Sequence, residues 1–225
     1  MKERGLRVKL TLEDDGAVSG MIQYVPIEYS LAEGKNLYFI NCIWVHGHKQ
    51  GIGNLQGRGI GKALLEAAET DVRSLGARGM VAWGLIIPVF TRAAWFKCQG
   101  YRRVDRVGMQ ALLWKPFAAD AKPPSWIRQS GEPALEPHKV TLTAYCNGWC
   151  PAQNIAIERA SRAASDPSLS KTVTFREVNT LDRPEHREAG LLGGLFVNRK
   201  EVRTGPPPSY EKIHKLISKQ AKKVA

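Results

Sequence analysis

The chain has 225 residues, of which 43% are hydrophobic and 24% are charged, and its formal net charge is +12. These proportions are typical of a globular protein whose core needs no metal or disulfide framework, and the length suits two domains. The basic charge favours a partner that carries phosphates. Two classes of partner fit at this point, nucleic acid and a polyanionic cofactor.

Three further observations bear on location. The N-terminus is charged and lacks the apolar segment of a signal peptide. No apolar run approaches the length of a membrane span. Four cysteines are too few for a secreted disulfide framework in a chain of this size. We therefore expect a cytoplasmic protein in a reducing environment, with no membrane partner.

The first part of the chain has the pattern of an α/β domain. Strands are expected at residues 6–13, 17–25, 37–45 and 80–87, with a closing hairpin at residues 101–106 and 109–114. A glycine-rich loop follows the apolar run 37–45. From Ile60 the apolar residues recur every three or four positions, which predicts a helix that ends at Gly76. A short helix is expected over 91–97.

Composition divides the rest of the chain. Five prolines stand among polar residues between Lys115 and Pro137, and they predict a linker, which we place at 118–138. The first domain is therefore expected to be 1–117, and a smaller α/β domain to be 139–225. In this second domain we expect strands at 139–145 and 172–178, helices at 151–164 and 210–223, and a strand or hairpin at 194–202.

The segment Gln56–Lys62, with the sequence QGRGIGK, follows a buried strand and begins a helix. Glycines let an anion approach the backbone, and the amides of a helix N-terminus favour negative charge. The segment is not a nucleotide P-loop, because Ala63 stands where that motif needs serine or threonine. It also lacks the tight strand–turn–helix unit of a dinucleotide-binding fingerprint. We expect a pyrophosphate site here.

This segment and its flanking elements resemble the acetyl-CoA loop of the GNAT acetyltransferases, over roughly the first half of the chain. The resemblance implies a mixed GNAT sheet, acetyl-CoA as cofactor, and acetyl transfer to a primary amine on a small molecule or protein. It also implies that the pantetheine arm pairs with the end of the strand at Ile43, Trp44 and Val45. The pyrophosphate would be held at Gln56, Gly57, Arg58, Gly59, Ile60, Gly61 and Lys62.

The chain departs from this family in three places. Its sheet is short at the N-terminus, because a strand and two helices usually precede the opening strand. The loop from Val45 to Gln56 is longer than usual. Phe96 stands where the family often has a tyrosine acid, and phenylalanine cannot donate a proton. For the base, the candidates are His46 and Glu28, and a solvated loop histidine is an equally good interpretation of His46.

The second domain carries a cysteine pair, Cys146 and Cys150, where a strand leads into a helix. Pro151 suits the first helical position, so Cys150 is predicted to cap the helix, where a thiolate is favoured. The segment resembles a thioredoxin-like fold, and together with the first domain it resembles YoaP-type acetyltransferases. The spacing is Cys-x3-Cys, however, and no proline precedes the strand at 194–197. Redox-active and purely structural thiols both fit, while a zinc site lacks its other two ligands.

Two hypotheses follow. The first is an acetyl-CoA-dependent N-acetyltransferase with a thiol-redox accessory domain. The second is a thiol-redox or thiol-binding protein whose first domain binds acyl-CoA without turnover. The lysines of the terminal helix are interpreted as a solvated face, so nucleic acid is disfavoured as a partner. A homodimer is left open, and no metal is expected.

Overall fold

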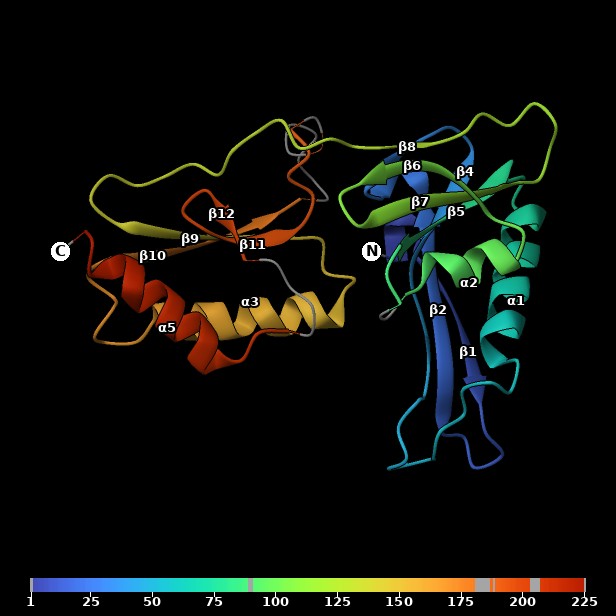
Figure 1. The fold of residues 1–225 in the computed structure, drawn as a ribbon, viewed down its shortest axis with the longest axis horizontal. Helices are drawn as coiled ribbons and strands as arrows, with labels where there is room; N and C mark the ends of the chain where they lie inside the picture. Colours follow the sequence, from blue (N-terminus) through green and yellow to red (C-terminus); the bar gives the residue numbers. More distant parts are fainter. Residues whose placement is uncertain (1, 89–90, 181–186, 188, 203–206, 225) are drawn as a thin grey trace. The chain divides into compact units, whose positions relative to one another are not determined.

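A computed structural model describes residues 2–88, 91–180, 187, 189–202 and 207–224. The chain divides into two compact units, Met1–Ile127 and Arg128–Ala225 (Figure 1). Each unit has its own sheet and its own buried core. In the part of the chain that the structure describes, no helix has the length and apolar character needed to cross a membrane.

The first unit is built on a six-stranded sheet with the order β1-β2-β4-β5-β7-β6. Its strands are β1 (Arg7–Leu12), β2 (Val18–Pro26), β4 (Leu37–Val45), β5 (Gly79–Leu85), β6 (Arg102–Val107) and β7 (Gln110–Pro116). All neighbours are antiparallel except β4 and β5, which run parallel. A parallel pair needs a crossover connection, and the helix predicted from Ile60 provides it.

Two helices cover one face of this sheet, α1 (Ile60–Ser74) and α2 (Ala93–Cys98). Apolar side chains from both helices pack with those of β2, β4 and β5 in a single core. The predicted end of α1 is confirmed, since Gly76 takes a φ of 80° directly after the C-cap Leu75. The α/β organisation of this unit is therefore the one the sequence predicts.

The opposite face carries a second core, which includes Trp126. It is formed with the short helix η2 (Ile27–Tyr29) and the two-residue strands β3 (Ala32–Glu33) and β8 (Ser125–Trp126), which pair with each other. A further short helix, η1 (Lys2–Arg4), precedes β1. The two units meet between Ile127 and Arg128, inside the segment 118–138 that is predicted to be a linker. The stretch up to Ile127 belongs to the first unit, because Trp126 is buried there and its backbone N–H bonds Asp105 at 2.8 Å.

The second unit has a four-stranded sheet with the order β10-β9-β11-β12. Its elements are β9 (Val140–Cys146), α3 (Pro151–Ala164), β10 (Val173–Asn179), β11 (Gly194–Val197), β12 (Lys200–Glu201) and α5 (Tyr210–Ala221). The central strand β9 is parallel to β10 and antiparallel to β11. Helices α3 and α5 pack side by side and contribute to one core with β9 (Figure 1). The predicted strand or hairpin at 194–202 is a hairpin.

Candidate active site

Strands β4 and β5 separate after a short paired stretch. The pairing covers Leu37↔Gly79, Tyr38↔Met80 and Phe39↔Val81, and among the described residues no backbone pairing joins the two strands beyond it. The Trp83 indole spans the gap by donating to the Asn41 carbonyl at 3.0 Å. The other edge of β4 stays paired with β2 as far as Val45. The end of β4 therefore has one edge without a partner strand.

An open cleft of about 800 Å³ lies at this end of β4. Its wall includes the end of β4, the glycine-rich loop, the start of α1, and the turn and helix that follow β5. Nine of the ten residues predicted to bind the cofactor line this cleft, namely Ile43, Trp44, Val45, Gln56, Gly57, Gly59, Ile60, Gly61 and Lys62. The fold thus brings together two segments that the sequence separates by a long loop.

The glycine-rich loop leaves its backbone accessible. Gly57 and Gly59 have φ angles of 83° and 81°, which side-chain-bearing residues rarely adopt. A Cβ atom added to either would meet nothing within 4 Å. Gly59 is also the N-cap of α1, and no side chain caps the helix there. The amides at the helix start, with the positive end of its dipole, can therefore receive an anion.

The tenth predicted residue, Arg58, does not line the cleft. Its guanidinium lies 3.8 Å from a carboxylate oxygen of Glu13 and is more than half exposed. Lys62 does line the cleft and lies 3.7 Å from Glu66 on the next turn of α1. Of the two cations in the motif, Lys62 is the one placed to face a phosphate.

His46 follows Val45 directly, at the end of β4. Its Nδ1 lies 2.7 Å from the Gly53 carbonyl oxygen. Because a carbonyl only accepts, this contact places the hydrogen of a neutral ring on Nδ1 and leaves the Nε2 lone pair available. Among the described residues Nε2 has no hydrogen-bond partner. The ring packs edge-to-face between Trp44 and His48, with both centroid separations at 5.8 Å.

Glu28, the other candidate base, lies at the opposite end of β4. It follows Pro26, which pairs with Tyr38 at the start of that strand. At about 3.3 Å per residue, the seven steps along the strand from Tyr38 to Val45 span roughly 23 Å. Neither Glu28, which is exposed, nor His46 is among the residues that line the cleft, but His46 directly follows the lining residue Val45. The structure therefore separates the two candidates and leaves His46 as the one beside the cleft.

Six further residues line the cleft that were not predicted to bind the cofactor. They are Leu55, Pro88, Thr91, Arg92, Trp95 and Phe96. A Cβ atom on Gly61 would lie 3.4 Å from the Trp95 ring, so this glycine lets the indole approach α1. A glycine inside the first helical turn was the available signal for such a contact. Phe96 is 1% exposed and belongs to the core, so position 96 supplies no proton donor.

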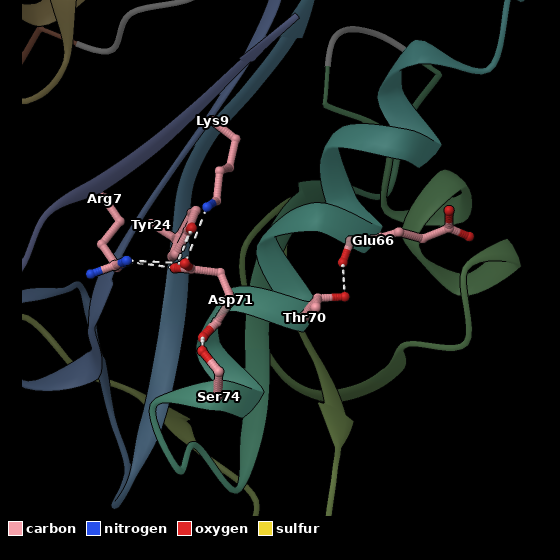
Figure 2. A network of polar contacts seen from close by, with 7 residues as sticks. All are labelled: Arg7, Lys9, Tyr24, Glu66, Thr70, Asp71 and Ser74. Atoms are coloured by element: carbon pink, nitrogen blue, oxygen red, sulfur yellow. Dashed lines mark hydrogen bonds and ion pairs between the residues drawn. The ribbon is translucent and has the colours of Figure 1, made fainter.

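An ionic network fixes α1 against the sheet (Figure 2). The Asp71 carboxylate accepts hydrogen bonds from Arg7 at 3.0 Å, Lys9 at 3.1 Å and the Tyr24 hydroxyl at 2.7 Å. The Arg7 bond above all holds the pKa of Asp71 well below its usual range, and burial raises the pKa of Tyr24. These bonds join α1 to β1 and β2, and so help to fix the helix whose N-terminus borders the cleft.

In the second unit the structure places Cys146 at the end of β9 and Cys150 at the N-cap of α3. Neither thiol forms a disulfide. The Cys146 sulfur lies 3.8 Å from the Asn154 side-chain oxygen. Burial raises the pKa of the Cys146 thiol, against an opposing bond from the Gly148 backbone. No cluster of three potential metal ligands occurs among the residues that the structure describes.

Comparison with known proteins gives one family. Residues 2–101 match the model of the acetyltransferase (GNAT) family. No curated protein matches the chain.

Several solved structures are similar to about half of the chain. An acetyltransferase from Bacillus cereus is 17% identical, with a TM-score of 0.40, over 52% of this chain and 79% of that one. The PaiA N-acetyltransferase of Thermoplasma acidophilum, solved with coenzyme A, is 14% identical, with a TM-score of 0.40, over 52% and 64%. A GNAT-family N-acetyltransferase (YhbS) of Escherichia coli, also with CoA, is 13% identical, with a TM-score of 0.42, over 56% and 69%. The family match is confined to residues 2–101, within the first unit, so it is to that unit's sheet and cleft that the acetyltransferase (GNAT) family is similar.

Proposed function

We propose that the first unit is an acetyl-CoA-dependent N-acetyltransferase that acts on a primary amine. The observation that carries this proposal is the convergence of the end of β4 and the glycine-rich loop on one cleft, within the segment that matches the family. The loop offers amides to a pyrophosphate, and the unpaired edge of β4 offers backbone groups to an extended pantetheine arm.

The chemistry proposed for this cleft is direct transfer. The amine nitrogen forms a bond to the thioester carbonyl carbon, the carbon–sulfur bond breaks, and its electron pair stays on sulfur. The amine must lose a proton in this step. His46 is proposed to accept that proton at Nε2, because Nδ1 is held by Gly53. Glu28 is not part of this proposal, because it lies at the other end of β4.

The acceptor is sought with a panel of primary amines, under reducing conditions that keep the thiols out of the reaction. The expected result is amine-dependent release of CoA from acetyl-CoA, with a matching acetylated product by mass spectrometry. Hydrolysis alone, at the same rate with and without amine, would contradict transfer to an amine.

Cofactor binding is tested with Gly59→Val. Valine at this position fills the space that faces the loop amides and cannot easily adopt the φ of 81°. We expect the affinity for CoA in calorimetry to fall at least about tenfold. Gly16→Val is the matched control, because Gly16 has a φ of 82°, equally open surroundings and a place in the β1–β2 turn. Equal CoA affinity in the two variants would sink the assignment of the loop.

For the second unit we propose a thioredoxin-like fold with a thiol function. The strand order β10-β9-β11-β12, with α3 between two parallel strands and an antiparallel hairpin before the last helix, supports it. The proposed thiol pair is Cys146 and Cys150, at the two ends of the loop between β9 and α3. Cys150 is the proposed nucleophile, since it caps α3, whereas burial raises the pKa of Cys146.

A second candidate function is a thiol-redox or thiol-binding protein whose first unit binds acyl-CoA without turnover. The buried phenylalanine at position 96 favours it, because the cleft then lacks the usual proton donor. The amine panel separates the two functions, since CoA binding without amine-dependent product supports the second. For both functions we propose acetyl-CoA or a related acyl-CoA as ligand and the cytoplasm as location.

A further inference from the structure

Thr91 occupies an unfavourable backbone conformation at the wall of the cleft. Its φ is +49°, in the left-handed region that β-branched residues avoid. Such a conformation is unfavourable in itself and persists only where surrounding contacts hold it. Thr91 is half-buried and lines the cleft.

Contacts with β5 hold this residue in place. The Thr91 carbonyl accepts a hydrogen bond from the Leu85 backbone N–H at 2.8 Å, and Arg92 forms a parallel bridge with Leu85. Gly84 makes this approach feasible, because a Cβ there would lie 2.9 Å from the Thr91 oxygen and 2.7 Å from the Ala93 nitrogen. The residues from Thr91 to Ala93 therefore lie close against the end of β5. These contacts hold Thr91 in its left-handed conformation.

The position of Thr91 relative to β4 follows from the residues that line the cleft. Thr91, beside the end of β5, and Ile43, near the end of β4, line the same cleft. Thr91, bonded to Leu85, then faces the end of β4 across the gap. On the proposed function, a ligand held by its phosphates at the glycine-rich loop extends its arm down this gap. The reacting end of the arm thus passes Thr91.

The chemistry of the cleft gives the hydroxyl a use. Among the described residues that line the cleft, Thr91 carries the only hydroxyl. The Thr91 hydroxyl has no hydrogen-bond partner among the residues that the structure describes. Ile43, Val45 and Phe96, which line the same cleft, offer no side-chain donor. A thiolate leaving group is stabilised by a donor placed before the reaction begins.

We propose that Thr91 is the thiolate-positioning residue of this cleft, with its hydroxyl donating a hydrogen bond to the sulfur of CoA. The inference rests on the proposed function of the first unit. The hydroxyl keeps its proton throughout. The carbon–sulfur electron pair stays on sulfur and is stabilised there, while the proton of the amine goes to the base. In this proposal the left-handed backbone conformation of Thr91 serves to orient its hydroxyl toward the sulfur.

The test compares two ligands, CoA and desulfo-CoA, by calorimetry at pH 8.5 with the full chain under reducing conditions. Wild type is expected to bind CoA about tenfold more tightly than desulfo-CoA. Thr91→Val keeps the β-branch and the strain but removes the hydroxyl, so it is expected to bind both ligands alike. Thr91→Ser is expected to restore the preference. Thr70→Val, on the exposed face of α1, is the matched control and should keep it.

Thr91→Gly adds a second readout. Glycine relieves the backbone strain and removes the hydroxyl, so the Tm is expected to rise by about 4 °C while the preference for CoA disappears. A purely structural threonine would give no loss of preference in any variant, and that result overturns the proposal. Equal weakening of both ligands by Thr91→Val also overturns it, because the hydroxyl would then contact another part of CoA. If wild type binds neither ligand, the proposed function itself fails.

Discussion

At the scale of the residue, His46 depends on a single hydrogen bond. The bond to Gly53 sets both the tautomer and the direction of the ring. We expect His46→Ala to lower kcat by about 10²-fold while the affinity for acetyl-CoA changes less than about twofold. His48→Ala is the matched control, because His48 packs against the same ring without a bond to Gly53. Equal loss of kcat in both variants would move the base elsewhere.

The sequence predicted some of the residues that line the cleft and missed others, for a physical reason. Gly57, Gly59 and Gly61 are visible in the sequence, because glycine has a conformational role that depends only on its neighbours in the chain. The presence of Thr91 and Trp95 in the cleft could not be predicted from local sequence, because it depends on how residues 91–96 pack near the start of α1. The place of Glu28 at the opposite end of β4 could not be predicted, since it depends on the direction of β2 relative to β4.

At the scale of the element, α1 is fixed by charge as well as by apolar packing. Its buried leucines face the core, and Asp71 bonds two neighbouring strands (Figure 2). The bounds of such an element follow closely from local pattern, and the predicted start at Ile60 is confirmed. Strands β3 and β8 were not predicted. Each has only two residues, and the two segments pair in a place where Trp126 is buried, which local pattern does not indicate.

Asp71→Asn tests this network. The variant removes the charge but keeps the shape, so it should lower the free energy of unfolding by about 1–2 kcal/mol at pH 7, measured in urea. The pKa of Asp71 is lower in the folded state than in the unfolded state. Its contribution is therefore present above the unfolded value near about 3.9, and is lost as pH falls toward the folded value.

The difference in stability between wild type and Asp71→Asn should thus be constant from about pH 5 to pH 8 and should shrink below about pH 4. Thr70→Val, one residue away and outside the ion pairs, serves as the control. A difference that is as large at pH 3 as at pH 7 would mean that the charge on Asp71 is not what stabilises the helix.

At the scale of the whole molecule, the chain has two units with separate cores. The sequence predicts two domains joined by a linker over 118–138, because prolines and polar residues cluster there, and the two compact units of the structure meet between Ile127 and Arg128. The sequence did not predict that Trp126, within this region, is buried. The composition of a linker does not indicate whether a single tryptophan packs onto a neighbouring sheet.

The proposed thiol pair of the second unit can be tested by oxidation. After equilibration in a glutathione redox buffer, we expect a peptide that links Cys146 with Cys150, two hydrogens lighter than its reduced form and restored by a dithiol. Cys42 and Cys98 are the internal control and should alkylate fully, since the proposed thiol pair lies in the other unit. Full alkylation of all four cysteines after oxidation would leave the pair with a structural role.

The separation of β4 from β5 has a consequence for selectivity. Exposed strand edges usually risk pairing with any other polypeptide, and proteins protect them for that reason. Here the unpaired edge of β4 lies inside the sheet. It faces β5, and the gap between the two strands closes where Phe39 pairs with Val81. A whole polypeptide strand cannot pass through a gap that closes after a few residues. An unbranched ligand that ends within the gap can enter it. The gap therefore selects its ligand by width and length, in addition to any specific contact with side chains.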